Sequence, residues 1–230
     1  MTVIPKWNRT ARREPDTASR RVSAWAELSK RAFDLVVGGA VLVVVSPVLA
    51  VVALLVLLFH GRPILFRQER VGRHGEPFTM LKFRSMVVNN DDSALREMNT
   101  RELTQGGGPG TSDGVYKLES DPRITPLGAV LRRYSLDELP QLFNVMRGDM
   151  SIVGPRPSLQ WEVDLFEPRF LRRHEVRPGL TGLWQVSGRN ELSMREMLAL
   201  DVEYVDTWSL RGDIALLLRT PKAVFSDGVR

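Results

Sequence analysis

The sequence of 230 residues contains no cysteine, which excludes a disulfide framework, a thiolate zinc site, an iron–sulfur cluster and a cysteine nucleophile. Histidine is scarce as well, and His60, His74 and His174 show no metal-ligand spacing such as H-E-x-x-H. Hydrophobic residues make up 43% and charged residues 26%, an ordinary composition that excludes collagen, a long coiled coil and wholesale disorder. The length suits one sizeable globular domain, or a smaller one with appendages.

The chain beyond residue 31 has no net charge. The formal net charge is +5, and residues 1–31 hold eight lysines and arginines against three acidic residues. The remaining 199 residues carry 24 charges of each sign and therefore have no excess. This distribution predicts a flexible basic arm at residues 1–29 whose partner is anionic membrane lipid. It argues against nucleic acid as a partner of the rest of the chain.

A long run without charge follows the arm. Residues 35–59 are 25 uncharged, mostly apolar residues, a length that predicts membrane association rather than a buried core helix. A straight helix of this length would measure about 37 Å, more than the roughly 30 Å hydrocarbon core. Ser46 and Pro47 lie at its centre, and proline bends or breaks a helix because it lacks a backbone donor. The Ser46 hydroxyl is a candidate donor for a carbonyl freed there.

Both flanks of this run are basic. Lys30 and Arg31 precede it, and Arg62 and Arg67 follow it. Cationic flanks prefer the cytoplasmic side of a membrane, and here both qualify. We therefore predict that residues 30–61 form a re-entrant membrane helix, broken at Ser46-Pro47, whose two ends lie at the cytoplasmic face of the membrane. Lys30 and Arg31 would be basic residues at the membrane surface, and a kinked spanning helix is the alternative.

Residues 62–230 are predicted to form a cytosolic catalytic domain of the α+β class, mainly helical. Residues 64–86 indicate a β-hairpin, and the polar, glycine-rich residues 88–120 indicate a mobile loop without the Lys-Ser/Thr of a P-loop. Helical stretches are expected at about 125–133, 136–147, 158–173, 193–206 and 210–226. The last stretch fits either a core-facing helix or an amphipathic interfacial helix.

The segment from Ser135 to Glu138 has two interpretations. S-x-x-E at a helix start is typical of a capping box, although Pro140 could instead begin the helix. Alternatively, Asp137 and Glu138 are adjacent carboxylates that could hold Mg²⁺ together with substrate phosphate oxygens. A carboxylate there could also attack phosphorus. In a chain without cysteine or clustered histidine, carboxylate–metal chemistry is the main catalytic option left.

Several arginines accompany this pair in conformationally restricted settings. Arg156 lies between two prolines, Arg177 precedes Pro178-Gly179, and Arg189 follows Ser187-Gly188. Guanidinium groups bind phosphate through two parallel hydrogen bonds, and prolines fix the backbone that aims them. Each alone is commonly a surface or turn arginine, whereas several beside an Asp-Glu pair indicate a diphosphate site.

Five segments together carry a resemblance to a known family and occur in that family's order. They are KRAFD at 30–34, LKFRSM at 81–86, SLDELPQL at 135–142, GDMSIVGPRP at 148–157 and RPGLTGLWQ at 177–185. Over about residues 28–226 the chain resembles the bacterial sugar transferases, monotopic phosphoglycosyl transferases that start exopolysaccharide, O-antigen or glycoprotein glycan assembly. Larger members carry additional N-terminal transmembrane helices, so the resemblance implies the minimal, exopolysaccharide-initiating form.

The resemblance implies a reaction and its residues. The family moves a sugar 1-phosphate from a UDP-sugar to undecaprenyl phosphate and releases UMP through a covalent aspartyl-phosphosugar intermediate. Asp137 would be the nucleophile, and Glu138 would orient it and share Mg²⁺ with it. The basic residues that would contact the nucleotide sugar are Lys82, Arg132, Arg156 and Arg189. Ser46-Pro47 matches the family's re-entrant break, and downstream glycosyltransferases or a second copy of the chain are further partners to consider.

Two other functions use the same features differently. A membrane-bound phosphatase or hydrolase could employ the same carboxylate–metal site, but it would not depend on polyprenyl phosphate. A non-enzymatic adaptor or nucleic-acid-binding protein with a basic arm would show neither activity. Nucleotide release from a panel of UDP-sugars, with and without the lipid, separates all three.

Overall fold

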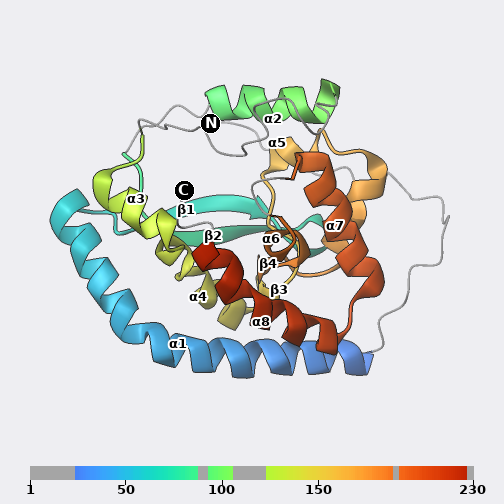
Figure 1. The fold of residues 1–230 in the computed structure, drawn as a ribbon, viewed down its shortest axis with the longest axis horizontal. Coiled ribbons are helices and arrows are strands. Elements are labelled where there is room, and N and C mark those ends of the chain that lie inside the picture. The colour runs from blue at the N-terminus through green and yellow to red at the C-terminus, as the bar shows by residue number, and fades with distance from the viewer. Residues whose placement is uncertain (1–23, 88–92, 106–122, 189–191, 227–230) are drawn as a thin grey trace.

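The computed structural model describes residues 24–87, 93–105, 123–188 and 192–226, and its first element is a single long helix. Helix α1 spans Ala24–His60 and continues through Pro47, where Figure 1 shows the helix changing direction partway along its length. Proline cannot donate to the carbonyl of Val43, and the Ser46 hydroxyl donates to that same oxygen at 2.8 Å. The expected donor is therefore confirmed. The start at Ala24 corrects the predicted arm, because residues 24–29 are helical.

One face of α1 packs on the rest of the protein, and the opposite face is exposed. Val37 and Val41 from its first half, and Leu49, Val52 and Val56 from its second, lie in apolar clusters with the body. The exposed face is apolar too and includes Val36, Val43, Val44, Val51, Leu54, Leu58 and Phe59. By length and composition α1 could cross a membrane, with a mean hydropathy of 3.2 over its most apolar window.

Two small sheets lie against this helix. Strands β1 (Leu65–Val71) and β2 (Pro77–Phe83) pair antiparallel across a 3-10 turn at Arg73–Gly75, which confirms the predicted hairpin. His74 lies in the left-handed region at φ 58°, as the tight turn requires. Strands β3 (Ser151–Val153) and β4 (Gly179–Thr181) pair in parallel. The fold is therefore mainly helical α+β, as predicted.

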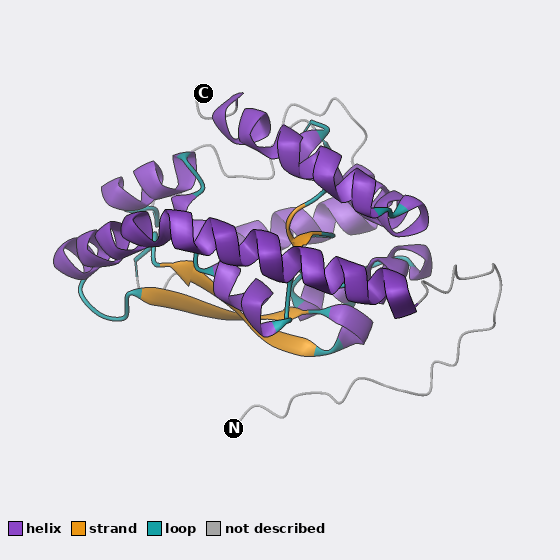
Figure 2. Ribbon diagram, turned by 90° about the horizontal axis from the view of Figure 1, so that it is seen from below, coloured by secondary structure: helices purple, strands orange, loops and turns teal. Residues whose placement is uncertain are grey.

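The remaining described elements are short helices that surround the strands (Figures 1 and 2). The α-helices are α2 (Ser93–Gln105), α3 (Pro126–Arg133), α4 (Gln141–Arg147), α5 (Gln160–Val163), α6 (Leu183–Val186), α7 (Met194–Thr207) and α8 (Leu210–Ser226). Two 3-10 helices, η2 and η3, span Leu136–Glu138 and Pro168–Glu175.

Three predicted elements need correction. The expected helix over 136–147 is a 3-10 turn followed by α4, because Pro140 cannot continue a hydrogen-bonded helix. The stretch over 158–173 is a single turn of α-helix and part of the 3-10 helix that begins at Pro168. Residues 93–105 of the expected loop form α2, whereas 88–92 and 106–120 lie outside the described residues.

Helix α8 packs one face on the core, as one of the two interpretations expected. Leu216 is buried in the cluster that also holds Tyr204 and Ile152. Leu218 and Ile214 on the same helix are exposed, so an apolar face remains that does not contact the body. Figure 2 shows α1 crossing the body, with the hairpin strands on one side and α8 on the other.

Candidate active site

The Asp-Glu pair lies in the 3-10 turn between α3 and α4. Ser135 has φ 54°, in the left-handed region, and its side chain makes no capping hydrogen bond. The capping-box interpretation is therefore wrong, and α4 begins directly after Pro140, as the alternative expected. Helix α3 carries its own cap, since the Thr125 hydroxyl accepts from the Gly128 amide at 3.0 Å.

The Asp137 carboxyl is almost completely buried, with 7% of the residue exposed. Burial is the largest influence and raises the pKa of Asp137 above its ordinary value. The Lys82 ammonium lowers that pKa, the Glu138 carboxylate raises it and the Arg132 guanidinium lowers it. A desolvated carboxylate between an acidic neighbour and two cations is a typical functional-site arrangement.

Lys82 reaches this turn from the hairpin, 56 residues earlier in the sequence. Its Nζ lies 2.8 Å from Glu138 Oε1, and both side chains are partly buried. The buried Asn144 of α4 fixes the strand: its Oδ1 accepts from the Leu81 amide at 3.1 Å, and its Nδ2 donates to the Thr79 carbonyl at 2.7 Å. Sequence reasoning missed Asn144, whose only signal is a polar residue between the core positions Leu142 and Val145.

A small cavity opens beside the pair, and polar residues of four chain segments line it. Its lining includes Lys82 and Glu138 together with Gln141, Arg156 and Gln185. Asp137 lies next to these residues without lining the cavity itself. The Gln185 Oε1 is buried and has no hydrogen-bond partner among the described residues, so this lining residue retains an unused acceptor.

The predicted arginines do not all gather here. Arg132 acts on Asp137, and Arg156 lines the cavity. Arg189 lies outside the described residues. Arg177 belongs elsewhere, because its Nε donates to the Gly148 carbonyl at 2.9 Å, and burial and neighbouring cations lower its pKa.

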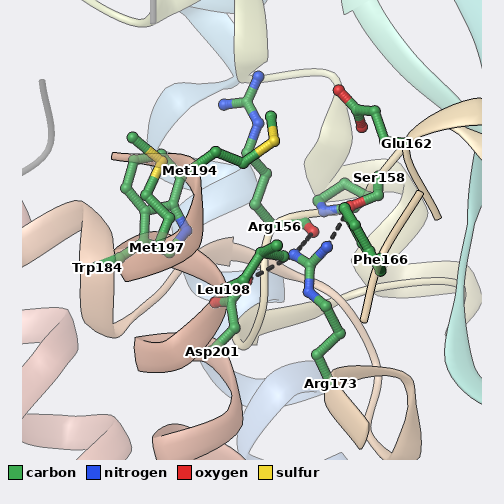
Figure 3. A pocket seen from close by; sticks show the side chains of 11 residues that line it. Arg156, Ser158, Glu162, Phe166, Arg173, Trp184, Met194, Met197, Leu198 and Asp201 are labelled. Atoms are coloured by element: carbon green, nitrogen blue, oxygen red, sulfur yellow. Dashed lines mark hydrogen bonds and ion pairs between the residues drawn. The ribbon is translucent and has the colours of Figure 1, made fainter. Parts of the chain in front are cut away.

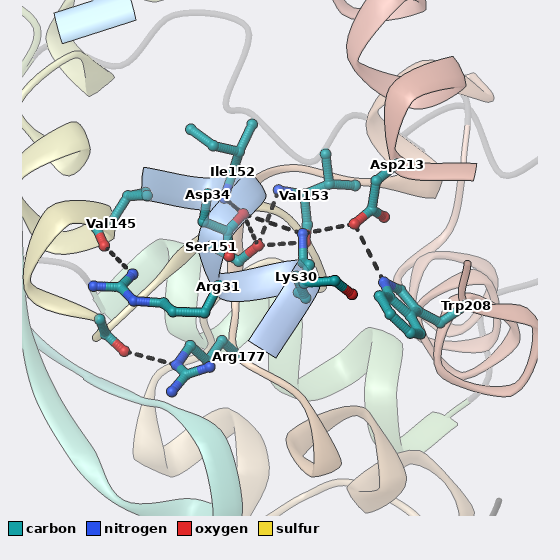
Figure 4. Close-up of polar contacts among 12 residues, drawn as sticks. Lys30, Arg31, Asp34, Val145, Ser151, Ile152, Val153, Arg177, Trp208 and Asp213 are labelled. Atoms are coloured by element: carbon teal, nitrogen blue, oxygen red, sulfur yellow. Dashed lines mark hydrogen bonds and ion pairs between the residues drawn. The ribbon is translucent and has the colours of Figure 1, made fainter. Parts of the chain in front are cut away.

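Lys30 and Arg31 make contacts within the protein (Figure 4). Lys30 Nζ lies 2.7 Å from Asp213 and 3.2 Å from Asp34, both fully buried. Arg31 donates to the carbonyls of Val145 and Met146, at the end of α4. Cations favour the carbonyl end of a helix, so Arg31 serves as a helix cap here. The membrane-surface role of both residues stays a prediction.

Mg²⁺, which the resemblance implies, suits the chemistry of these donors. Asp137 and Glu138 are adjacent carboxylates, and the burial that disfavours a charged Asp137 would be offset by a cation. The described residues include no group of three or more histidine, aspartate or glutamate side chains that could hold a metal alone. Mg²⁺ commonly uses one or two carboxylates and completes its shell with water and substrate phosphate.

Comparison with known proteins agrees with these motifs. The family model described as "Bacterial sugar transferase" matches residues 25–227. The chain is 40% identical over 200 residues to the exopolysaccharide production protein ExoY of Rhizobium meliloti, covering 86% of this chain and 85% of that protein. It is 42% identical over 200 residues to the undecaprenyl-phosphate galactose phosphotransferase of Salmonella typhimurium, covering 85% of this chain and 40% of that protein.

A third relative names a different sugar. The chain is 40% identical over 211 residues to the UDP-glucose:undecaprenyl-phosphate glucose-1-phosphate transferase of Caulobacter vibrioides, covering 87% of this chain and 72% of that protein. The matched region includes both carboxylates, the hairpin lysine and the proline-flanked arginine described above.

Proposed function

Because the chain belongs to the bacterial sugar transferase family and is an enzyme of the phosphoglycosyl transferase class, we propose that it transfers a sugar 1-phosphate from a UDP-sugar to undecaprenyl phosphate. UMP is the released product, and the step is the first membrane reaction of an exopolysaccharide or related glycan. The observation that carries the proposal is the convergence of Lys82 and Arg132 on the buried Asp137 and its partly buried neighbour Glu138.

Asp137 acts as the nucleophile in the first half of the reaction. One of its carboxylate oxygens forms a bond to the phosphorus that bears the sugar, and the bond from that phosphorus to the bridging oxygen of the diphosphate breaks. The electron pair leaves with UMP, and an aspartyl-phosphosugar remains. In the second half, an oxygen of undecaprenyl phosphate attacks the same phosphorus, and the bond to Asp137 breaks. The free carboxylate returns, so no net proton transfer is required.

The cations explain how two anionic substrates react with a carboxylate. Phosphoryl transfer depends on positioning and on stabilising negative charge on the transferred group. Lys82, Arg132 and Arg156 supply positive charge around the turn, and Arg189 would contribute a fourth cation. Mg²⁺, held by Asp137 and Glu138, would neutralise further phosphate charge when bound. A two-step path also avoids bringing three anionic groups together at once.

We also propose that α1 is re-entrant, and its packing supports this arrangement. Apolar residues from both halves of the helix, from Val37 to Val56, contact the same polar body. If α1 spanned the bilayer, that body would have to enter the hydrocarbon core, at a high desolvation cost. A helix that enters and leaves at the cytoplasmic face keeps the body at the interface, where the lipid phosphate and the soluble nucleotide sugar meet.

The reaction is tested with the purified full chain in lipid nanodiscs. UMP release is measured with a panel of UDP-sugars, with and without undecaprenyl phosphate, in the presence of Mg²⁺. We expect sustained release to need both substrates and Asp137→Asn to abolish it. The matched control is Asp164→Asn, because Asp164 is an exposed carboxylate that accepts from the Gln160 side chain at 2.9 Å and lies outside the cavity lining. Release that continues without the lipid would instead support a hydrolase.

Membrane topology is tested separately. The chain has no native cysteine, so single cysteines at positions 28 and 64 can be labelled selectively in sealed vesicles. We expect both to react from the same side. Labelling from opposite sides would contradict the re-entrant arrangement and leave the chemical proposal standing.

A further inference from the structure

Arg156 lies on a short segment whose backbone has few hydrogen-bonding groups of its own. Pro155 and Pro157 flank it, so neither neighbour has a backbone N–H. The Arg156 side chain lines the cavity beside Lys82 and Glu138, and Arg156 also lines a second cavity between this segment and α7. The carbonyls of Pro155 and Pro157 accept from the Gly179 amide at 2.8 Å and from Arg70 at 3.2 Å. What holds the Arg156 carbonyl between them therefore helps to direct its guanidinium.

A buried ion pair contacts the backbone of Arg156 (Figure 3). Arg173 of the 3-10 helix and Asp201 of α7 lie 2.6 Å apart, with side chains 3% and 2% exposed. Arg173 also donates to the backbone carbonyl of Arg156 and to the Ser158 hydroxyl. A single guanidinium thus connects α7 with the residues on both sides of Pro157.

Asp201 lies close to the same residue. Burial raises the pKa of Asp201 to about 6, although the Arg173 guanidinium and the nearby Arg156 lower it. The ion pair therefore holds Arg156 through the Arg173 guanidinium, which donates to the Arg156 carbonyl and is itself held by Asp201.

The ion pair is poorly suited to a purely stabilising role. Asp201 Oδ1 and Arg173 Nε are buried without a hydrogen-bond partner among the described residues. Desolvating two charges costs several kcal/mol, and imperfectly satisfied pairs of this kind are often no better than packed hydrophobic residues. The presence of two buried charges at this position is better explained by the Arg156 backbone that they orient.

We propose that Arg173 and Asp201 are positioning residues that hold the Arg156 backbone, and through it the Arg156 guanidinium, in place for the transferred phosphate. The inference rests on the proposed function, because it assumes that Arg156 binds this phosphate. Its chemistry is indirect: neither member of the pair touches substrate, and both act through the Arg156 carbonyl that the Arg173 guanidinium holds.

The test replaces the pair with apolar residues of similar volume, Arg173→Met together with Asp201→Leu. The site is already lined by Phe166, Met197 and Leu198, so an apolar pair can pack there. We expect the thermal midpoint to stay near that of the wild type. We expect kcat/KM for the UDP-sugar to fall by about 10- to 100-fold, since a misplacement of about 1 Å can cost about 100-fold.

The neighbouring ion pair provides a matched control. Arg172 and Asp206 join the same two elements at 2.6 Å but are partly exposed, and Arg156 is not among their partners. Arg172→Met together with Asp206→Leu removes the same kinds of charge, one residue before Arg173 and five residues after Asp201. We expect kcat/KM in this control to stay within about twofold of the wild type, as for other surface pairs.

A thermodynamic cycle with Arg156→Ala distinguishes positioning from general damage. Once the Arg156 side chain is gone, loss of the ion pair should cost little more, because interacting residues are not additive. If the apolar pair fails to fold, Arg173→Lys serves instead: it keeps the charge pair but cannot reach all three oxygens. We expect the Arg173→Lys variant to fold. It should lose activity when Arg156 is present and lose little more when Arg156 has already been replaced by alanine.

Three outcomes overturn the inference. Pair variants that keep wild-type kcat/KM while Arg156→Ala loses it would refute the positioning role alone. Additive losses in the Arg156→Ala background would assign the pair to general stability. A wild-type chain without sugar-dependent UMP release, or an unaffected Arg156→Ala variant, would overturn the proposed function or the role of Arg156, and the inference with it.

Discussion

Replacing Lys30 by methionine should strongly destabilise the protein, because this lysine is the shared counter-ion of two buried carboxylates. Asp34 and Asp213 are fully buried, and Lys30 Nζ lies within 3.2 Å of the first and 2.7 Å of the second. Methionine retains most of the aliphatic length but removes the charge. The variant therefore leaves two buried acids without a formal positive partner, at the junction of α1, β3 and α8.

The magnitude follows from the partners that remain. Breaking a buried ion pair by removing one member costs about 3–5 kcal/mol. Asp34 keeps bonds from the Ser151 hydroxyl at 2.9 Å and the Ile152 amide at 3.1 Å. Asp213 keeps bonds from Tyr204 at 2.9 Å and Trp208 at 3.2 Å. Because these neutral donors remain, we expect the free energy of unfolding to fall by about 3 kcal/mol, the lower end of that range. For a chain of this size, this corresponds to a fall of about 6–12 °C in the thermal midpoint.

The effect should depend on pH in a defined direction. Burial raises the pKa of Asp213 above its ordinary value, while Lys30 lowers it. With a folded pKa above the unfolded one, the stabilisation that Asp213 gains as a neutral acid is present below about pH 4 and is lost as pH rises through the folded pKa. Removing Lys30 raises the folded pKa further. The deficit of the variant should therefore be smallest in acid and widen toward neutral pH.

Thermal unfolding in detergent between about pH 4.5 and 8 measures both features. The matched control is Arg101→Met, which breaks an exposed pair with Glu97 and should cost about 0–1 kcal/mol at every pH. A variant with the midpoint of the wild type at neutral pH would show that the buried acids need no counter-ion. A deficit that does not change with pH would show that Lys30 acts through packing or lipid contact instead.

Three further predictions concern the site and its supports. Gly128→Ala should destabilise the protein by about 1–3 kcal/mol, because the new Cβ would lie 1.9 Å from the Ser85 carbonyl oxygen. Thermal unfolding measures the loss, and Gly39→Ala is the control, because the nearest atom to its new Cβ lies 3.9 Å away. Asn144→Leu should lower UMP release about tenfold or more, because strand β2 loses the two bonds that fix Lys82, and a normal rate would refute that link. Chelation with EDTA should abolish release and added Mg²⁺ should restore it, whereas full activity in EDTA would contradict the metal assignment.

Local patterns predicted much of the fold. The hairpin at 64–86, helices α3, α7 and α8, and the apolar helix α1 follow from periodicity, turn residues and an uncharged run. Predictions went wrong where proline made the local signal ambiguous. Pro140 directly precedes α4 and Pro168 begins a 3-10 helix, whereas the predicted helices ran through both positions.

Some residues of the candidate site could likewise be predicted from the sequence, and others could not. The Asp137-Glu138 pair and Arg156 were identifiable because adjacent residues mark them: two consecutive carboxylates in the first case and two flanking prolines in the second. Their supports were not: Asn144, Asp34 and the Arg173–Asp201 pair are ordinary polar residues until folding buries them. Burial changes their energetics, because a buried polar group must find partners that distant segments supply.

The absence of cysteine, the confinement of net charge to the first 31 residues and the uncharged run predicted membrane association and left carboxylate–metal chemistry as the main catalytic option. The Asp137-Glu138 pair, the arginines and the five family motifs then made a phosphoglycosyl transferase the leading hypothesis. Only the tertiary structure decided which cations serve it. Lys82 was brought to the site, Arg177 was directed to a backbone carbonyl elsewhere, and Lys30 was placed between buried acids. A cation's role depends on the charges and carbonyls within a few ångströms of it, and those neighbours are set by the fold rather than by position along the chain.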